Sequence, residues 1–310
     1  MNVRAENTEQ GRGAALPDHD QRVERPGYVV FFDRLFRAKL PAIGLGIILL
    51  IVLMAIFAPY LAPHDPTKIT VEDRLKPPVW SEDGDARYLL GTDSLGRDVL
   101  SRLIYGARVS LIVGFSAVVI SGTIGVLLGL IAGYAGGRVE DFIMRLADIQ
   151  LAFPYILLAI AVLAVLGPGL VNIIFTLSIA GWPQYGRVVR GQVVSYRERE
   201  FVEAAEALGA SGSRVVFQHI LPNIAAPVIV IASFAVAGTI ISEASLSFLG
   251  LGVQPDVATW GAMLSIGREY VREAWWLSVL PGLAIVATVL GVNVFGDWLR
   301  DYLDPKLDAF

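Results

Sequence analysis

Long runs without a single charged residue constrain the fold of this chain more than any other feature of its sequence. A helix needs about 20 apolar residues to cross the hydrocarbon core of a bilayer. The charge-free runs are 40–63, 109–137, 149–186, 222–242 and 274–296. Most of them are long enough to span, so the sequence predicts an all-α integral membrane protein.

The third run is too long for one crossing. Gly167-Pro168-Gly169 interrupts it with turn-forming residues that a continuous helix does not tolerate. We therefore expect two spans here, 149–166 and 170–186, joined by a tight turn. The predicted total is six transmembrane helices.

Composition excludes several other classes of protein. Of the 310 residues, 55% are hydrophobic and 17% are charged, whereas about 25% are charged in soluble domains. The absence of cysteine excludes disulfides, a thiol nucleophile and a cysteine-ligated metal. A net charge of -4 gives no reason to expect nucleic acid as a partner.

Basic residues predict the orientation. With the N-terminus inside, 16 of the 25 Lys and Arg residues fall on internal segments and 9 on external ones. Arg102 and Arg108, at the outer end of the second span, run locally against this bias. The total favours a multi-pass protein of the cell membrane with both termini in the cytoplasm. We expect the first span to be an uncleaved anchor.

Three regions follow from these spans. Residues 1–35 are expected to form a disordered cytoplasmic tail, because its first part has few large apolar side chains. Residues 36–107 hold the first span and a long external loop. Residues 108–305 hold the other five spans.

The predicted spans lack the groups that would power transport. Their interior polar residues are amides and hydroxyls, which more often bridge helices than bind a substrate. The amides include Asn172, Gln184, Asn223 and Asn293, whereas Asp148, Glu243 and Asp297 fall at span ends. No Gly-Lys dipeptide exists to form a phosphate-binding loop. An active transporter of this kind needs energy from another subunit.

The longest internal loop predicts two short helices beneath the bilayer. Phe201, Val202, Ala205 and Leu208 share one helical face, and Gly209 is placed as a C-cap. Ser211 or Ser213 is then expected to cap a second short helix. An amphipathic helix at the lipid interface is the alternative to a protein docking site.

The spacing within this loop resembles the EAA loop of ATP-binding-cassette (ABC) importer permeases. The matching residues are Glu203, Ala204, Ala205, Gly209, Leu221 and Pro222. Segment 90–108 is similar to the stretch that enters the second helix of dipeptide, oligopeptide and nickel permeases. Its signature residues are Gly91, Thr92, Asp93, Gly96, Arg97 and Asp98. Segments 243–264 and 281–305 also resemble that family, and 58–66 resembles its C-type subunit.

The resemblance implies the transmembrane domain of a type I ABC importer with a cytoplasmic coupling loop. Its implied partners are a second, B-type permease, one or two ABC ATPases and an extracytoplasmic solute-binding protein. The chain itself is then a transport subunit rather than an enzyme. It holds no cofactor or metal, and ATP and Mg are bound by the partner ATPase. The binding protein is expected to dock on loops 64–108 and 243–273.

Two local expectations concern the second span. Asp93 or Ser94 is expected to cap an outer helix that turns inward at Gly106. Further along this span, a glycine at every fourth position permits another helix to pack closely. The simplest expectation is that this helix belongs to the same subunit. These packing glycines are Gly125, Gly129 and Gly133.

Di- and oligopeptides are the leading candidate substrates, because peptides are the most frequent substrates of the family that the chain resembles. Nickel or another small solute, imported by the same kind of transporter, is the alternative substrate. A stand-alone channel or ion-coupled carrier is a less favoured class, because the spans lack charged residues at their centres. A membrane enzyme is disfavoured, because the histidines His19, His64 and His219 fall in different segments.

Overall fold

The computed structural model describes residues 27–254 and 256–303, and the chain divides into two units, 1–38 and 39–310. The described part of the first unit is helix α1 (Gly27–Arg37), in which Arg37 pairs with Asp33 at 2.9 Å. The tail predicted to be disordered is therefore helical from residue 27 to residue 35. Residues 1–26 lie outside the described part of the chain.

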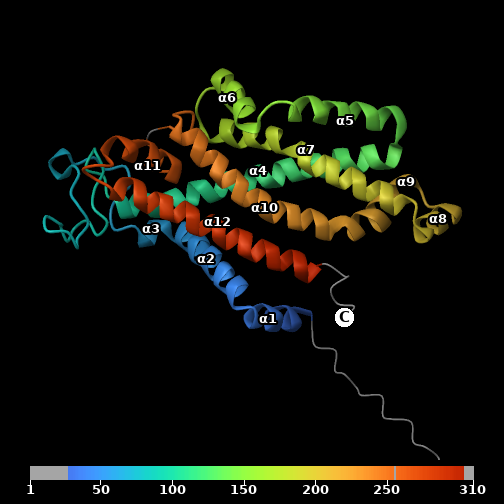
Figure 1. Cartoon of the computed structure of the whole chain (residues 1–310), viewed down its shortest axis with the longest axis horizontal. Helices are drawn as coiled ribbons and strands as arrows, with labels where there is room; N and C mark the ends of the chain where they lie inside the picture. The colour runs from blue at the N-terminus through green and yellow to red at the C-terminus, as the bar shows by residue number, and fades with distance from the viewer. Residues whose placement is uncertain (1–26, 255, 304–310) are drawn as a thin grey trace, which may run out of the picture. The chain divides into compact units, whose positions relative to one another are not determined.

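The second unit is built from helices and loops (Figure 1). Within the described residues, the one β-type pairing is an isolated antiparallel bridge between Thr92 and Asp98. The helices up to the middle of the chain are α2 (Lys39–Ile56), α3 (Ala58–Leu61), η1 (Val71–Asp73), α4 (Val99–Ala135), α5 (Gly137–Leu151), α6 (Tyr155–Leu166) and α7 (Leu170–Arg197). Those that follow are α8 (Glu200–Ala207), α9 (Gly212–Arg214), η2 (Val215–Ile220), α10 (Leu221–Phe248), α11 (Trp260–Gly267), η3 (Arg268–Tyr270) and α12 (Trp276–Leu303).

Four helical stretches are long and apolar enough to cross a membrane. They are α2, α4, the continuous stretch Gly212–Phe248 and α12. Counting the bent pair α5 and α6 as one span raises the number to five. The fold class is therefore all-helical with four or five apolar spanning helices in the described part of the chain.

The predicted span 149–166 is broken. Helix α5 covers the predicted loop 138–148 and ends at Leu151, and α6 begins only at Tyr155, at 89° to α5. Pro154 explains the break, because a proline disfavours helical geometry in the residue before it. The predicted turn at 167–169 is present, and both of its glycines have positive φ.

Helix α4 runs without interruption from Val99 to Ala135, so the predicted inward turn at Gly106 is wrong. Gly106 instead allows Trp260 to approach, since a Cβ there would lie 2.9 Å from the indole. The cap of α4 is Asp98, whose side chain accepts a hydrogen bond from the Ser101 N–H. The cap is therefore not Asp93 or Ser94.

Helix α4 packs along α7 at very short range. A Cβ at Gly125 would lie 2.5 Å from the Trp182 carbonyl oxygen, and a Cβ at Gly129 would lie 2.7 Å from Val189 Cβ. At Gly133 it would lie 2.7 Å from Val193 Cβ. These three glycines line one contact between two helices of the same chain.

The second short helix predicted after Gly209 does not exist as a separate element. Ser211 is the N-cap position of α9, but its side chain caps no backbone N–H. The helix that starts at Gly212 continues through the π-helical turn η2 into α10 and ends at Phe248. Glu243, predicted to fall at a span end, therefore lies inside a helix.

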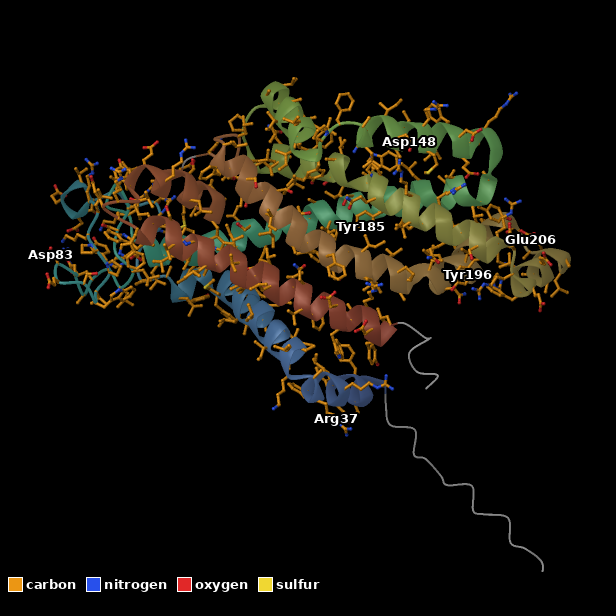
Figure 2. The ribbon with its side chains drawn as sticks, viewed as in Figure 1. Arg37, Asp83, Asp148, Tyr185, Tyr196 and Glu206 are labelled. Atoms are coloured by element: carbon orange, nitrogen blue, oxygen red, sulfur yellow. The ribbon has the colours of Figure 1, made fainter. Side chains whose placement is uncertain are left out.

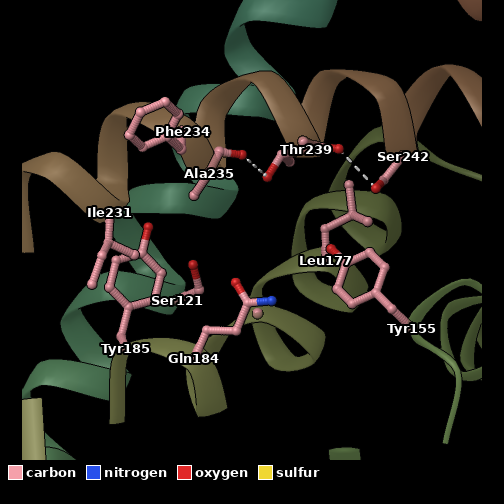
Figure 3. Close-up of a pocket in the computed structure, with 12 residues that line it drawn as sticks. Ser121, Tyr155, Leu177, Gln184, Tyr185, Ile231, Phe234, Ala235, Thr239 and Ser242 are labelled. Atoms are coloured by element: carbon pink, nitrogen blue, oxygen red, sulfur yellow. Dashed lines mark hydrogen bonds between the residues drawn. The ribbon is translucent and has the colours of Figure 1, made fainter. Parts of the chain in front are cut away.

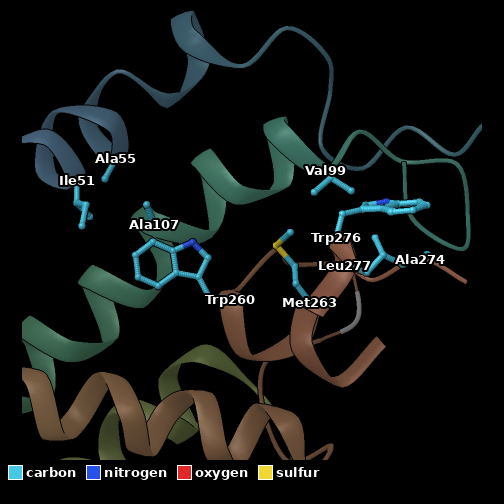
Figure 4. Packing of buried hydrophobic residues seen from close by; sticks show 9 residues of the cluster. All are labelled: Ile51, Ala55, Val99, Ala107, Trp260, Met263, Ala274, Trp276 and Leu277. Carbon is cyan, nitrogen blue, oxygen red and sulfur yellow. The ribbon is translucent and has the colours of Figure 1, made fainter. Parts of the chain in front are cut away.

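A buried apolar cluster joins α2, α4, α11 and α12 (Figure 4). Trp260 lies at its centre, fully buried, and donates a 3.0 Å hydrogen bond from its indole N–H to the Leu103 carbonyl. Its other members are Ile51, Ala55, Val99, Ala107, Met263, Ala274, Trp276 and Leu277. This cluster fixes the start of α4 against the start of α12.

Candidate functional site

Helix α8 and the turn after it form a compact surface segment. The N–H of Gly209 donates to the Glu206 carbonyl at 2.9 Å, and the N–H of Ala210 donates to the Ala205 carbonyl at 3.0 Å. This hydrogen-bond pair is the Schellman motif, which requires a left-handed residue after the helix. Gly209 supplies it with φ of +84°.

The predicted coupling residues all lie in or near this segment, but they differ in exposure. Glu203, Ala204 and Gly209 are exposed, and Ala205 is half-buried. Leu221 and Pro222 lie in the first turn of α10, on the far side of η2. Another protein can therefore reach Glu203, Ala204 and Gly209.

The predicted apolar face of α8 is divided. Val202 is fully buried in a cluster with residues of α4, α7, η2 and α10. Leu208 is 89% exposed and Phe201 is 41% exposed. One side of α8 therefore packs on the chain, while apolar side chains at its two ends remain uncovered.

Tyr134, near the end of α4, ties α8 to its neighbours. Its hydroxyl donates to Glu206 Oε1 at 3.1 Å, and its carbonyl accepts from Arg197 Nη1 at 3.0 Å. Its ring also packs against Gly212, where a Cβ would lie 2.9 Å away. The sequence predicted no role for this residue, because no motif marks it.

A network of polar residues lies at the end of α4 opposite to α8, in the loop around residues 62–98. Figure 2 marks the two ends by Asp83 in this loop and Glu206 in α8. The signature residues Thr92, Asp93, Arg97 and Asp98 are all buried here. They are therefore part of a folded scaffold rather than an exposed binding surface.

Asp93 holds this scaffold together. Its Oδ1 accepts the N–H groups of Leu95 and Arg97 at 2.9 and 3.0 Å. Its Oδ2 accepts the Arg97 Nε–H at 2.7 Å. Gly96 turns the loop with φ of +75°, where a Cβ would collide with the Thr70 carbonyl.

Thr92 connects the loop to the last helix. Its carbonyl accepts from the Trp276 indole at 3.2 Å, and its hydroxyl donates to the Asp73 carbonyl at 2.5 Å.

The two loops predicted to be external also meet at one cavity of about 680 Å³, whose lining includes His64, Asp65 and Asp256. The structure thus brings residues of segments 64–108 and 243–273 together.

Asp73 is the centre of an ion-pair network in the same loop. Its carboxylate pairs with Lys76 at 2.5 Å and Arg87 at 3.0 Å, and it accepts the Tyr88 hydroxyl at 2.9 Å. The hydrogen bond from Lys76 is the largest of the effects that lower the pKa of Asp73. Asp85 also pairs with Lys76 and Arg87, and Arg87 does most to lower the pKa of Asp85.

A cavity of about 370 Å³ lies between α4, α6, α7 and α10 (Figure 3). Six of its lining residues carry polar side chains, and none of the twelve is charged. The polar ones are Ser121, Tyr155, Gln184, Tyr185, Thr239 and Ser242. Gln184 was predicted to bridge helices, but within the described residues its side chain makes no hydrogen bond.

Glu243 is fully buried near the end of α10. Ser247 donates to its Oε1 at 2.7 Å, and Ser110 of α4 donates to its Oε2 at 3.3 Å. Among the described residues it has no cationic partner. This carboxyl group links α10 to α4 by hydroxyl contacts alone.

Two family models match the chain. Residues 125–309 match the "Binding-protein-dependent transport system inner membrane component" model. Residues 29–78 match the "N-terminal TM domain of oligopeptide transport permease C" model. The two matches together include α8, the first spanning helix and the lining residues of the central cavity except Ser121.

Two curated relatives are similar over most of the chain. The Di/tripeptide transport system permease protein DppC of Pseudomonas aeruginosa (strain UCBPP-PA14) is 51% identical over 264 residues, which are 85% of this chain and 87% of the relative. The Dipeptide transport system permease protein DppC of Alkalihalophilus pseudofirmus (strain ATCC BAA-2126 / JCM 17055 / OF4) is 45% identical over 293 residues, 94% of each chain.

A solved structure of the MetNI methionine ABC transporter, in an inward-facing conformation, contains a chain of similar fold. The TM-score is 0.56 at 18% sequence identity, and the match covers 66% of this chain and 97% of that one. The likeness concerns the fold alone.

Proposed function

The chain belongs to the family of binding-protein-dependent transport system inner membrane components, and we propose that it imports dipeptides as one permease subunit of an ABC importer. The observation that carries this proposal is the 51% identity with a di/tripeptide permease over 85% of the chain. The match to the N-terminal model of a C-type permease supports the C-type position in the complex.

In this proposal the chain crosses the membrane six times. The bent pair α5 and α6 forms one crossing, and α7 forms another. Segment 170–186 of α7 carries no charge and is about 26 Å long at 1.5 Å per residue. That nearly matches the roughly 30 Å hydrocarbon core. The three arginines of α7 follow this segment, between it and α8.

An even number of crossings places both termini on one side. The bias of basic residues favours the cytoplasm for that side. Helix α8 then lies in the cytoplasm, and the scaffold around Asp93 lies outside. This placement puts both α8 and the scaffold around Asp93 in water.

We assign α8 and Gly209 to contact with a separate ATPase subunit. Exposed Glu203 and Ala204 leave a surface with little side-chain bulk, and Leu208 offers an uncovered apolar contact. ATP-driven closure of the ATPases would displace α8 and switch the permease pair between inward- and outward-open states. ATP and Mg belong to that partner.

The external scaffold is the docking surface for a solute-binding protein in this mechanism. The two external loops meet around one cavity, so a docked protein contacts both. Released solute enters between this chain and a B-type permease. A ligand shifts such an equilibrium only by its differential affinity for the two states.

The first test is a gentle detergent pull-down of the tagged chain from its own membranes, followed by mass spectrometry. We expect a second permease chain and a protein with a phosphate-binding loop. The recovered complex is then placed in proteoliposomes, and uptake of labelled dialanine is measured with its binding protein and ATP. Recovery of the chain alone, or uptake that persists without ATP, would favour a self-contained channel or carrier. Uptake of Ni²⁺ but not peptide would assign the substrate to nickel.

A further inference from the structure

We propose that the cavity between α4, α6, α7 and α10 is a passage site that hydrogen-bonds the amide group of a peptide and ignores the charge of its side chains. The inference rests on the proposed function, because it names the chemistry that this chain offers to the transported peptide. Figure 3 shows its lining residues around one space.

The cavity lies within the predicted membrane-spanning part of the chain. Its α10 residues, between Ile231 and Ser242, recur every three or four positions and so share one face of the helix. Ser121 lies in the middle of α4. Figure 2 places Tyr185 between the end marked by Asp83 and the end marked by Glu206.

The polar lining is not a general property of this bundle. A cavity of about 560 Å³ between α2, α4, α10 and α12 is lined mainly by aliphatic side chains of these helices. Another of about 580 Å³, around Phe115, is also largely apolar. A polar group buried at this depth costs free energy unless it is paired. The polar side chains around this space that have no partner within the described residues, Gln184 and the buried Tyr185 hydroxyl among them, therefore indicate a polar occupant.

Three of the hydroxyls in the cavity are available only as acceptors. Thr239 donates to the Ala235 carbonyl at 2.7 Å, and Ser242 donates to the Gly238 carbonyl at 2.8 Å (Figure 3). Ser121 donates to the carbonyl of Val118 at 3.2 Å. Each hydroxyl proton is thus used within its own helix, and the oxygen remains free to accept.

Two neighbouring residues of α7 supply unused hydrogen-bonding groups. The Tyr185 hydroxyl is buried, and among the described residues it has no hydrogen-bond partner. The Gln184 carboxamide extends into the space drawn in Figure 3. Gln184 can donate to a carbonyl and accept from an N–H, while Tyr185 can donate to a carbonyl.

This set of groups matches a peptide amide. An amide presents one N–H donor and one C=O acceptor, and Gln184 with Tyr185 can satisfy both. A volume of about 370 Å³ falls within the range of small-ligand pockets, about 300–1,000 Å³. No charged group lines the cavity, so it cannot favour an acidic or a basic side chain. The site therefore accepts dipeptides of any charge and releases them readily.

The test uses the assembled transporter in proteoliposomes, with its binding protein saturated by peptide. We compare Gln184→Leu with the matched control Gln192→Leu, two turns further along α7 and outside the cavity lining. Uptake of dialanine is expected to fall about three- to tenfold in Gln184→Leu, as for one lost hydrogen bond. The control should match wild type.

The sharper measurement is the ratio of dialanine uptake to uptake of its ester analogue, which lacks the amide N–H. Wild type should prefer the amide, and Gln184→Leu should lose most of that preference. Aspartyl-alanine and lysyl-alanine should fall by the same factor as dialanine. Tyr185→Phe removes only the hydroxyl and should also lower uptake, with normal recovery of the complex.

The outcomes separate this inference from the proposed function. If wild type imports no dipeptide, the proposed function fails. If wild type imports dipeptides, and the amide-to-ester ratio is the same in Gln184→Leu, the passage site is overturned. A loss confined to acidic or to basic dipeptides would overturn it as well, because the site would then recognise side chains.

Discussion

The Tyr134 hydroxyl, near the end of α4, donates a 3.1 Å hydrogen bond to Glu206 of α8, which lies 72 positions later in the chain. The carbonyl of the same tyrosine accepts from Arg197, at the end of α7. One residue therefore links the surface segment α8 to two long helices. In the proposed mechanism, this contact is the route by which movement of α8 reaches α4.

The first prediction removes this hydrogen bond. Tyr134→Phe keeps the ring, so packing against Gly212 should persist and the complex should assemble. Uptake of dialanine by the reconstituted transporter is expected to fall about three- to tenfold, with smaller loss of ATP hydrolysis. Tyr196→Phe is the matched control, because the Tyr196 ring packs on Phe201 and its hydroxyl makes no hydrogen bond within the described residues. Equal uptake by the two variants would contradict the prediction.

The second prediction concerns the turn after α8. Gly209→Val places a β-branched residue at φ of +84°, which is a strained conformation. We expect the complex to assemble but to lose uptake and binding-protein-stimulated ATP hydrolysis. Gly191→Val on α7 is the control, since nothing lies within 4 Å of a Cβ there and its φ is not positive. Survival of both activities in Gly209→Val would show that the coupling assignment is wrong.

The third prediction concerns pH and the external scaffold. The pKa of Asp73 is lowered from 3.8, mainly by the hydrogen bond from Lys76. A carboxyl group whose folded pKa is depressed stabilises the fold above its ordinary pKa, and that stabilisation is lost as pH falls through the folded value. Pepsin cleavage in loop 62–98 should therefore increase as pH is lowered below about 4.

Asp73→Asn should increase this cleavage at the upper end of the pepsin range and flatten its dependence on pH. Asp83→Asn is the control, because Asp83 is exposed in the same loop and forms no ion pair within the described residues. If Asp73→Asn showed the pH profile of wild type, the network around Asp73 would not hold the loop.

The fourth prediction concerns the packing of α4 on α7. Gly125→Ala would place a methyl group 2.5 Å from the Trp182 carbonyl oxygen, so the helices must separate. We expect a loss of about 1–3 kcal/mol of stability, read as a lower unfolding temperature of the purified complex. At Gly122 the nearest atom would be 3.5 Å away, and Gly122→Ala should have little effect. The reverse order of the two variants would contradict the packing.

The sequence was most informative where the fold depends on neighbours along the chain. The charge-free runs located the four helical stretches that are long and apolar enough to span, within the described residues, and Gly167-Pro168-Gly169 predicted the turn between α6 and α7. Gly209 was placed correctly after α8, because a left-handed residue there has few alternatives. These features follow from backbone preference and hydropathy, which a short window of sequence contains.

Features that depend on distant contacts were not predicted. Gly106 was interpreted as a turn, but Trp260, more than 150 residues later, occupies the space beside it and the helix continues. Asp93 or Ser94 was expected to cap a helix, but the Asp93 carboxylate accepts the N–H groups of Leu95 and Arg97, and Asp98 is the cap. Gln184 gave no sign that it lines a cavity, since most of its cavity neighbours come from three other helices.

The unbroken course of α4 has a mechanical consequence. This helix of 37 residues is about 55 Å long at 1.5 Å per residue, and it starts in the scaffold around Asp98 and ends beside Tyr134. If a continuous helix of this length tilts by about 5° about one end, its other end moves by about 5 Å. In the proposed mechanism, a tilt of this one continuous helix would therefore carry a movement at Tyr134 to the loop around Asp98.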